Sequence, residues 1–141
     1  MSKFKYQKQI ESIPNCPSSA CKPMNIEAFR FVFEDMNHIN NFLPVLLIKP
    51  MRRLPTYSAR CSGYALSFFT TLEKARSRYL ELKKRGIKNI EENLGTHIAK
   101  GTIDETDGVV SEINKSGHFD LHEFKNTDLK RKFDAACVIE G

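Results

Sequence analysis

The chain has 141 residues, of which 40% are hydrophobic and 28% are charged, and its formal net charge at pH 7 is +5. This composition excludes an intrinsically disordered chain, and the length allows a core large enough to fold without a metal or a disulfide. The longest apolar run, residues 42–48, is far shorter than the roughly 20 residues that span a bilayer, so we expect no membrane partner.

The compartment and the state of the cysteines are predicted together. Residues 1–12 are polar and basic and lack the apolar stretch of a signal peptide, so we expect a cytoplasmic protein. The reducing cytosol then favours free thiols at Cys16, Cys21, Cys61 and Cys137. We expect residues 1–141 to form one domain, whose N-terminal segment, 1–25, is a candidate for loose order.

Charge is distributed unevenly along the chain. Residues 1–88 carry 16 Lys and Arg against 6 Asp and Glu, whereas residues 89–141 carry 6 against 11. A dipolar surface of this kind can steer an anionic partner, such as nucleic acid or an acidic protein, onto one side. The alternative is that the opposite charges only keep a small domain soluble.

The first half of the chain mixes short apolar segments with loops. Residues 26–33 have apolar side chains at helical spacing, which predicts a short helix, although their phenylalanines also alternate as in a strand. Residues 45–49, between two prolines, predict a buried strand. Residues 50–63 hold two prolines, a glycine and three arginines, and we expect an exposed loop.

The clearest element is a strand followed by a helix. Residues 64–69 predict a short strand, and Thr70 lies three residues before Glu73, the spacing of a capping box. The helix, 71–85, ends in basic residues followed by Gly86, which favours a left-handed stop. Its apolar face consists of Leu72, Ala75, Tyr79 and Leu82.

The last third of the chain is rich in predicted strands. After a helical turn at 87–94, strands are expected at 96–103, 109–113 and 118–124 as an antiparallel meander, because turn-forming clusters separate them. A turn near 127–132 leads to a last strand, 135–139. The predicted fold is therefore α+β, a mostly antiparallel sheet of five or six strands with helix 71–85 packed on one face.

Histidines and cysteines are the candidate metal ligands. His118, Asp120 and His122 alternate onto one strand face, where His97 is a further imidazole, but side chains two apart on a strand are about 6.5 Å apart and converge poorly. The alternative is a polar, solvent-facing side of the strand. Cys16 and Cys21 lack a second spaced pair of ligands, so we expect no metal.

Glu123 lies at the end of the same strand, on the face of Phe119 and Leu121. If that face is the core, the carboxylate is partly buried and becomes a candidate for a perturbed pKa and a catalytic role. The alternative is a terminal glutamate that reaches solvent, as most do.

The predicted main helix is strongly basic and is a candidate site for phosphates or other anions. The alternative is an ordinary solvated helix face. The candidate anion-binding residues are Lys74, Arg78, Lys83, Lys84 and Arg85.

Residues 64–75, YALSFFTTLEKA, resemble the strand-then-helix segment of ADP-ribosyltransferase-like domains. In that family the segment lines the nicotinamide pocket of NAD, an arginine, histidine or tyrosine comes from an earlier strand, and a glutamate comes from a later one. The resemblance implies NAD as cofactor, Arg52 or Arg53 at its phosphates and Glu123 as the catalytic carboxylate. It further assigns Tyr64, Ser67 and Thr70 to the nicotinamide pocket.

Two classes of function follow. The first is a small NAD-using ADP-ribosyltransferase-like effector or toxin, of the kind used in phage defence, acting on nucleic acid or protein. The second is a non-enzymatic module that binds nucleic acid or an acidic protein through the basic helix and the residue after it, 71–88.

Overall fold

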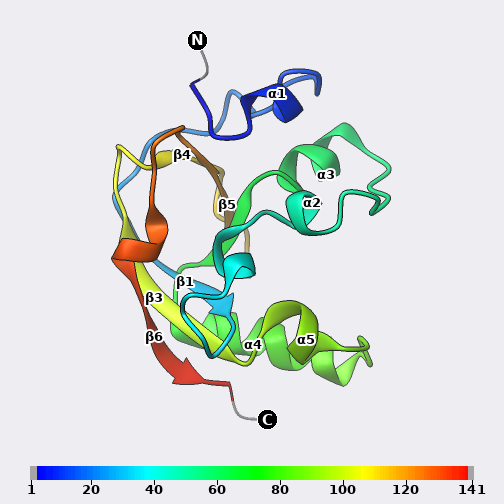
Figure 1. The fold of residues 1–141 in the computed structure, drawn as a ribbon, viewed down its shortest axis with the longest axis vertical. Helices are drawn as coiled ribbons and strands as arrows, with labels where there is room; N and C mark the ends of the chain where they lie inside the picture. The colour runs from blue at the N-terminus through cyan, green and yellow to red at the C-terminus, as the bar shows by residue number, and fades with distance from the viewer. Residues whose placement is uncertain (1–2, 140–141) are drawn as a thin grey trace.

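Residues 3–139 are described in a computed structural model whose strands form one antiparallel sheet in the order β4-β5-β2-β1-β3-β6 (Figure 1). The strands are β1 (Ile26–Val32), β2 (Leu66–Phe69), β3 (His97–Ile103), β4 (Gly108–Val110), β5 (His118–Glu123) and β6 (Phe133–Val138). The helices are α1 (Gln7–Ile10), α2 (Val45–Ile48), α3 (Tyr57–Ser62), α4 (Leu72–Lys84) and α5 (Ile90–Leu94), with 3-10 turns η1 (Ile39–Phe42) and η2 (Leu129–Lys132). The predicted α+β class is confirmed.

In two segments the structure has a strand where a helix was predicted, or a helix where a strand was predicted. The helix predicted at 26–33 is wrong, because β1 pairs with β3 along its whole length and the alternation of its phenylalanines prevails over their helical spacing. The strand predicted at 45–49 is wrong as well, since the segment forms α2. A proline at each end limits ladder hydrogen bonds, whereas one helical turn needs only local ones, such as Lys49 N–H to the Val45 carbonyl at 2.7 Å.

The loop predicted at 50–63 contains a helix. Its second half forms α3, which begins where the Thr56 hydroxyl accepts a hydrogen bond from the Ala59 N–H at 3.0 Å. The meander is also only partly correct, because β4 pairs with β5 but not with β3. Residues 104–107 instead carry the chain from β3 to β4, which is the edge strand beside β5.

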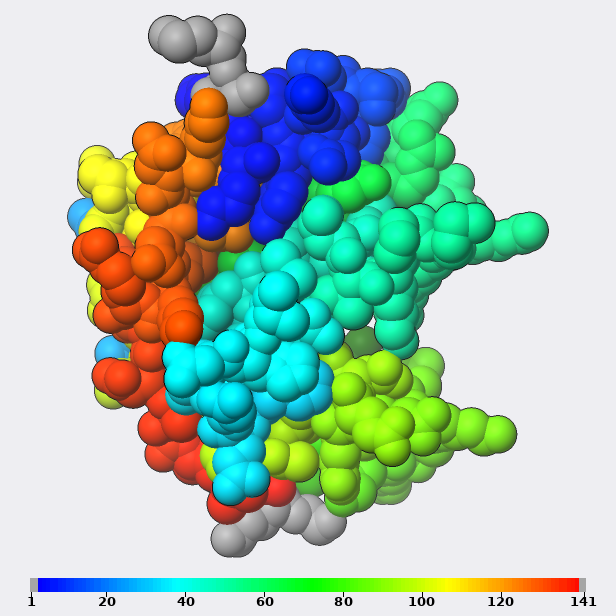
Figure 2. Space-filling view, viewed as in Figure 1, coloured from blue at the N-terminus to red at the C-terminus, as the bar shows by residue number. Residues whose placement is uncertain are grey.

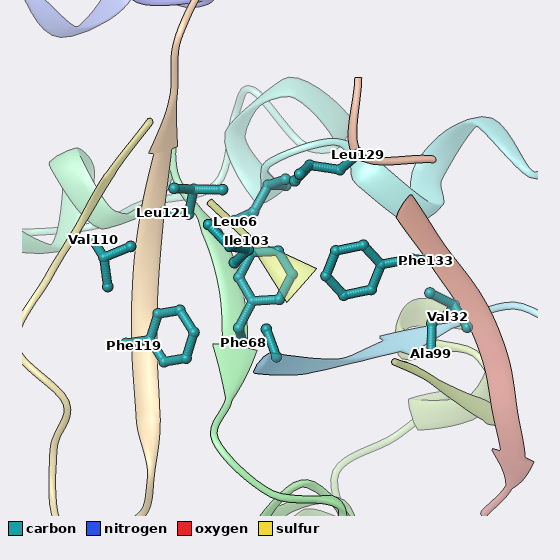
Figure 3. Packing of buried hydrophobic residues seen from close by; sticks show 11 residues of the cluster. Val32, Leu66, Phe68, Ala99, Ile103, Val110, Phe119, Leu121, Leu129 and Phe133 are labelled. Carbon is teal, nitrogen blue, oxygen red and sulfur yellow. The ribbon is translucent and has the colours of Figure 1, made fainter. Parts of the chain in front are cut away.

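The main core covers one face of the sheet. In Figure 3 the rings of Phe68, Phe119 and Phe133 face one another between strands of both halves of the sheet. The ring centroid of Phe68 lies 5.7 Å from that of Phe119 and 5.6 Å from that of Phe133. Burying large aromatic surfaces in this way supplies much of the driving force for folding.

α4 covers the other face, as predicted, with Ala75 and Tyr79 buried on a second cluster. The helix begins one residue later than its predicted cap: Thr71, rather than Thr70, accepts from the Lys74 N–H at 3.1 Å, so Thr70 and Glu73 form no capping box. Leu72 and Leu82 are only half-buried. Gly86 ends the helix at φ 79°, the expected left-handed conformation.

The sheet is split at its centre. β2 pairs with β5 at four positions and β1 pairs with β3 at seven, but β1 and β2 are paired only at Phe29 and Phe69. Beyond that point the two strands separate. The sheet therefore consists of two halves, β4-β5-β2 and β1-β3-β6, that diverge towards the start of β2.

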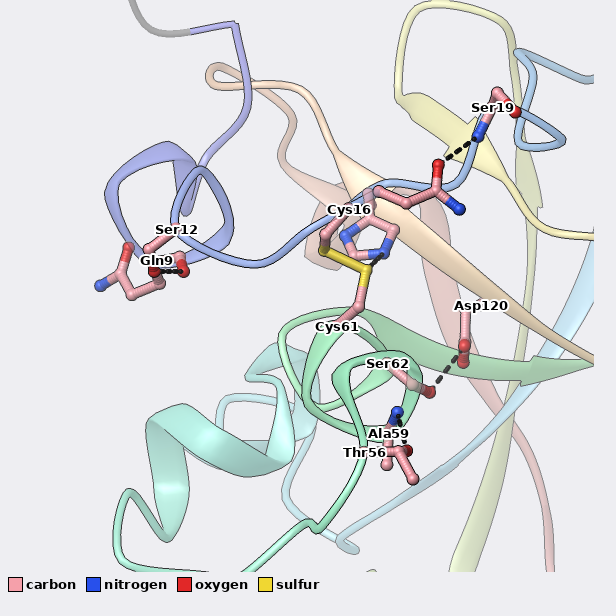
Figure 4. Close-up of a disulfide and its surroundings, with 11 residues drawn as sticks. Gln9, Ser12, Cys16, Ser19, Thr56, Ala59, Cys61, Ser62 and Asp120 are labelled. Carbon is pink, nitrogen blue, oxygen red and sulfur yellow. Dashed lines mark hydrogen bonds between the residues drawn. A yellow bond between two sulfur atoms is a disulfide. The ribbon is translucent and has the colours of Figure 1, made fainter.

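The N-terminal segment, 3–22, is attached to the rest of the molecule at several points. Phe4 bridges to Phe124, Lys22 bridges to Val110, and Ile10 and Ile13 are buried. A disulfide joins Cys16 to Cys61 of α3, so the prediction of free thiols is wrong for this pair (Figure 4). The two cysteines are 45 residues apart in sequence, and only the tertiary fold brings them together.

No helix among residues 3–139 is both long and apolar enough to cross a lipid bilayer.

The position of Tyr79 predicts a large effect of one substitution on stability. Its ring is 2% exposed and its hydroxyl donates to the Gly95 carbonyl at 2.8 Å. Tyr79→Asp should lower the free energy of unfolding by about 3 kcal/mol or more, because it places a charge without a partner in the core. Tyr79→Phe should cost only about 1 kcal/mol, the value of the lost hydrogen bond.

Urea denaturation measures both variants. Ser77→Asp, on the exposed side of the same helix, is the matched control and should leave the unfolding midpoint close to that of the unsubstituted protein. Equal effects of Tyr79→Asp and Ser77→Asp would contradict the packing of α4.

Candidate functional site

A cleft opens where the two halves of the sheet separate. It consists of two adjoining cavities, of about 440 Å³ and about 900 Å³, which share Arg52, Ser67, Asn93 and Leu94 in their walls. Figure 2 shows the hollow between the segment that contains α2 and α3 and the segment that contains the end of α4 and α5. A cleft of this size is large enough for a cofactor.

Arg30 of β1 fills the gap between the diverging strands. It lines the cavity of about 440 Å³, which we call the inner cavity. Its Nε donates to the Asn41 carbonyl at 2.7 Å, and its guanidinium donates to the carbonyls of Ser67 at 2.9 Å and Leu43 at 3.5 Å. Burial lowers the pKa of Arg30 to about 10, and the negative charge of Glu123 partly opposes this effect. Arg30 therefore stays charged at neutral pH and holds the two halves together at the floor of the cleft.

Sequence reasoning missed Arg30 because it lies in the segment that was predicted as a helix. The alternation of Phe29, Phe31 and Phe33 was the signal that could have found it: on a strand, residue 30 points to the face opposite the phenylalanines.

The cleft brings together some of the predicted residues. Arg52 and Ser67 lie in its wall with Arg78 of α4, so a predicted cofactor-binding arginine and a predicted anion-binding arginine face the same space. Lys49 adds a third positive charge at the cavity of about 900 Å³, which we call the outer cavity.

Three other predicted residues do not line this cleft. Arg53 is exposed and belongs to neither cavity. Tyr64 lies in the turn before β2 and Thr70 directly after its end, and neither residue is in the wall of either cavity. The Thr70 N–H donates to the Gly117 carbonyl at 2.9 Å, in the turn before β5.

Glu123 is buried, so the alternative of a solvent-reaching strand end is wrong. It is 4% exposed on the face of Phe119 and Leu121, and its Oε2 accepts from Lys5 Nζ at 2.7 Å. The other oxygen, Oε1, is buried without a hydrogen-bond partner among the described residues. Burial raises the pKa of Glu123 above its ordinary value, while Lys5 and Arg30 lower it by less.

The surroundings of Glu123 link it to the N-terminal segment as well as to the split. Burial and the negative charge of Glu123 together raise the pKa of Tyr6 to about 12. The Lys5 N–H donates to the Glu123 carbonyl at 3.0 Å, so residues 4–6 cover the carboxylate. Glu123 lines neither cavity of the cleft.

A serine, a histidine and an aspartate lie together on the opposite face of β2 and β5. Ser67 Oγ is 2.7 Å from His118 Nε2, and the same nitrogen is 3.6 Å from Asp120 Oδ1. In a catalytic triad the hydroxyl and the carboxylate contact different ring nitrogens. The nitrogen next to the hydroxyl accepts its proton, and the N–H of the other nitrogen donates to the carboxylate, which holds the ring in place. This cluster lacks that geometry. Asp120 instead accepts from the Ser62 hydroxyl at 2.7 Å (Figure 4).

The predicted metal set is not assembled. His97 lies on β3 and contacts its neighbour Thr96, with 2.8 Å between Nδ1 and Oγ1. His122 is not solvent-facing but 5% exposed, and burial lowers its pKa. Its Nε2 is 3.5 Å from the sulfur of Cys61. The one grouping of metal-ligand side chains found within the described residues is Cys16, Cys61 and His122.

The basic side chains of α4 are partly neutralised by acidic neighbours. Arg78 and Arg85 contact Glu81 at 2.9 Å and 3.8 Å, and Lys83 contacts Glu91 of α5 at 3.6 Å. Lys74 Nζ lies 3.5 Å from a backbone carbonyl. Among the described residues Lys84 forms no ion pair.

Comparison of the chain with protein-family models, curated proteins and solved structures gave no significant match.

The buried carboxylate predicts a specific pH dependence of stability. Because the pKa of Glu123 is raised above the ordinary 4.5 in the folded state, its contribution to stability is fully present below the unfolded pKa and is lost as pH rises through the folded pKa. Glu123→Gln does not titrate, so its free energy of unfolding should increase relative to the unsubstituted protein as pH rises from about 4 to about 8.

Denaturant unfolding across that pH range measures the difference. Glu112→Gln, at an exposed position, is the control and should follow the unsubstituted protein at each pH. A Glu123→Gln difference that is constant with pH would show that the carboxylate is not perturbed.

Proposed function

We propose that this chain is a small NAD-using ADP-ribosyltransferase-like domain that acts on nucleic acid or protein. The supporting observation is that Arg30, Ser67 and Glu123 lie on three adjacent strands, β1, β2 and β5, and that Arg30 and Glu123 influence each other's pKa, although the Ser67 and Glu123 side chains are on opposite faces. The family resemblance of residues 64–75 implies that chain order: an arginine on an earlier strand, a serine-containing strand before a helix, and a glutamate on a later strand. Arg30 takes the place on the earlier strand.

The charges and shape of the cleft fit a dinucleotide. Arg52, Arg78 and Lys49 surround the outer cavity and suit the pyrophosphate, because guanidinium groups bind phosphate oxygens in pairs. Phe31 and Phe33 line the inner cavity and offer aromatic surface to the nicotinamide ring. The guanidinium of Arg30 has five N–H groups, of which three are used, so donors remain for the cofactor.

The carboxylate of Glu123 fits the charge that develops in the reaction. When the bond between nicotinamide and ribose breaks, nicotinamide leaves with the electron pair, and a nucleophile of the acceptor attacks the ribose carbon and loses its proton. Glu123 lies outside the walls of both cavities, so in this reaction the ribose has to reach the carboxylate beyond the cleft. There Glu123 stabilises the positive charge on the ribose, and its free Oε1 accepts a hydrogen bond from a ribose hydroxyl. Lys5 now neutralises Glu123, so catalysis requires residues 4–6 to move away from the carboxylate.

The remaining parts of the proposal concern context. An effector or toxin of the phage-defence kind is the role that the resemblance implies, and the cytoplasmic location stays a prediction. The alternative function is a non-enzymatic module that binds nucleic acid or an acidic protein through residues 71–88. The exposed side chains of Lys83, Lys84 and Arg85 favour it.

Substitution of Glu123 tests the enzymatic proposal. Glu123→Gln keeps the size of the side chain but removes its charge, so NAD turnover should fall by roughly two orders of magnitude or more, the scale of losing one preorganised electrostatic contact. Release of nicotinamide is the measurement, and a thermal-shift titration with NAD checks binding separately.

Arg30→Lys and Glu112→Gln complete this experiment. Arg30→Lys loses the planar fork and should weaken the NAD-induced thermal shift, whereas the exposed Glu112→Gln should change neither binding nor turnover. Absence of both a thermal shift and nicotinamide release in the unsubstituted protein would refute the enzymatic proposal.

Charge reversal at the end of α4 tests the alternative. The triple variant Lys83→Glu, Lys84→Glu and Arg85→Glu should weaken binding to a nucleic acid and flatten the dependence of that binding on salt. Electrophoretic mobility shifts with single-stranded and double-stranded DNA and RNA, at two salt concentrations, measure both. Unchanged affinity for each probe would leave these residues as an ordinary solvated surface.

A further inference from the structure

Three side chains from separate parts of the chain converge beside the N-terminal segment. Cys16 comes from the loop after α1, Cys61 from α3 and His122 from β5. Their ligand atoms, two sulfurs and an imidazole nitrogen, all lie within 4.8 Å of one another. Figure 4 shows the bond between the two cysteines where the loop passes over α3.

The position of His122 is not explained by the disulfide alone. The imidazole is buried, and its one hydrogen-bond contact recorded among the described side chains is the sulfur of Cys61. A sulfur in a disulfide is a weak acceptor, so the contact compensates poorly for the burial of a polar ring. Two cysteines and a histidine are, in contrast, a preferred ligand set for zinc.

We propose that Cys16, Cys61 and His122 bind one Zn²⁺ ion when the disulfide is reduced. The inference does not depend on the proposed enzymatic function. It also replaces the sequence-based expectation of no metal, which considered Cys16 only with Cys21 and did not join Cys61 and His122.

The geometry suits a tetrahedral ion. With Zn–S near 2.3 Å and Zn–N near 2.0 Å, a sulfur and a nitrogen on one tetrahedral zinc are about 3.5 Å apart. Cys61 Sγ and His122 Nε2 already have that separation, 3.5 Å. Two thiolates on one zinc are about 3.8 Å apart. The sulfur–sulfur bond therefore has to be reduced first, and Cα atoms 5.6 Å apart allow the side chains to rotate into place.

The change from the disulfide to the zinc site is chemically balanced when a thiol is the reductant. Two thiols of a low-molecular-weight reductant are oxidised to their disulfide while Cys16 and Cys61 become thiols. Binding of Zn²⁺ then releases two protons, one from each cysteine, and His122 donates the lone pair of Nε2. The fourth position of the ion is left for water, as in open zinc sites. The N-terminal segment thus stays joined to α3 and β5 in both states.

The test uses the full chain, reduced with a phosphine and freed of the reductant and of metal without oxygen. Native mass spectrometry after addition of Zn²⁺ should show one ion per chain, and Co²⁺ should give the visible absorption of a tetrahedral thiolate site. His122→Gln and the double variant Cys16→Ser, Cys61→Ser should lose the bound ion. Cys137→Ser, on β6, is the matched control and should retain it.

Protection of the thiols gives a second readout that needs no variant. In the reduced protein Zn²⁺ should protect Cys16 and Cys61 from alkylation, whereas Cys137 should react equally with and without the ion. Reduced protein that binds no stoichiometric zinc, or His122→Gln that binds zinc as tightly as the unsubstituted chain, overturns the proposal. A disulfide that resists reduction in the folded protein also overturns it.

Discussion

The Arg30 side chain joins the two halves of the sheet, and the arrangement of the cleft depends on it. β1 and β2 share a single backbone pairing, so the carbonyls beyond it lack the partners that a continuous sheet would supply. Arg30 supplies donors to the Ser67, Asn41 and Leu43 carbonyls, and its guanidinium lies over the ring of Phe68, 5.7 Å from the centroid. One long cationic side chain thus gives the Ser67 carbonyl of β2 a donor that β1 does not supply, and it also joins the η1 segment to the split through Asn41 and Leu43.

The separation creates a site that a continuous sheet would lack. Side chains of β1 and β2 near the split line a cleft, and the segments around α2 and α5 form its walls. Arg30 and Glu123 are both desolvated and close enough to influence each other's pKa. Buried charges of this kind add little net stability compared with apolar residues of the same volume, which supports a functional reason for them.

The N-terminal segment is the second device that the tertiary structure adds. It neutralises Glu123 through Lys5, buries Ile10 and is fixed to α3 through Cys16. This segment covers the Glu123 carboxylate and is cross-linked next to His122. The oxidation state of Cys16 and Cys61 is therefore coupled to the packing of the segment on this side of the molecule. The geometry of the cover and that of the cross-link are independent observations, and each can be tested without the other.

Local patterns determined the elements whose stabilising contacts are close in sequence. The stripe, basic end and terminal glycine of α4 sufficed to predict it, and alternation placed Glu123 on the core face with Phe119. Only the tertiary structure decided the rest, because contacts between distant residues determined it. Pairing with β3 made residues 26–32 a strand and placed Arg30 at the split, and the fold brought Cys16 to Cys61 across 45 residues. The spacing of residues along the chain does not identify these distant partners.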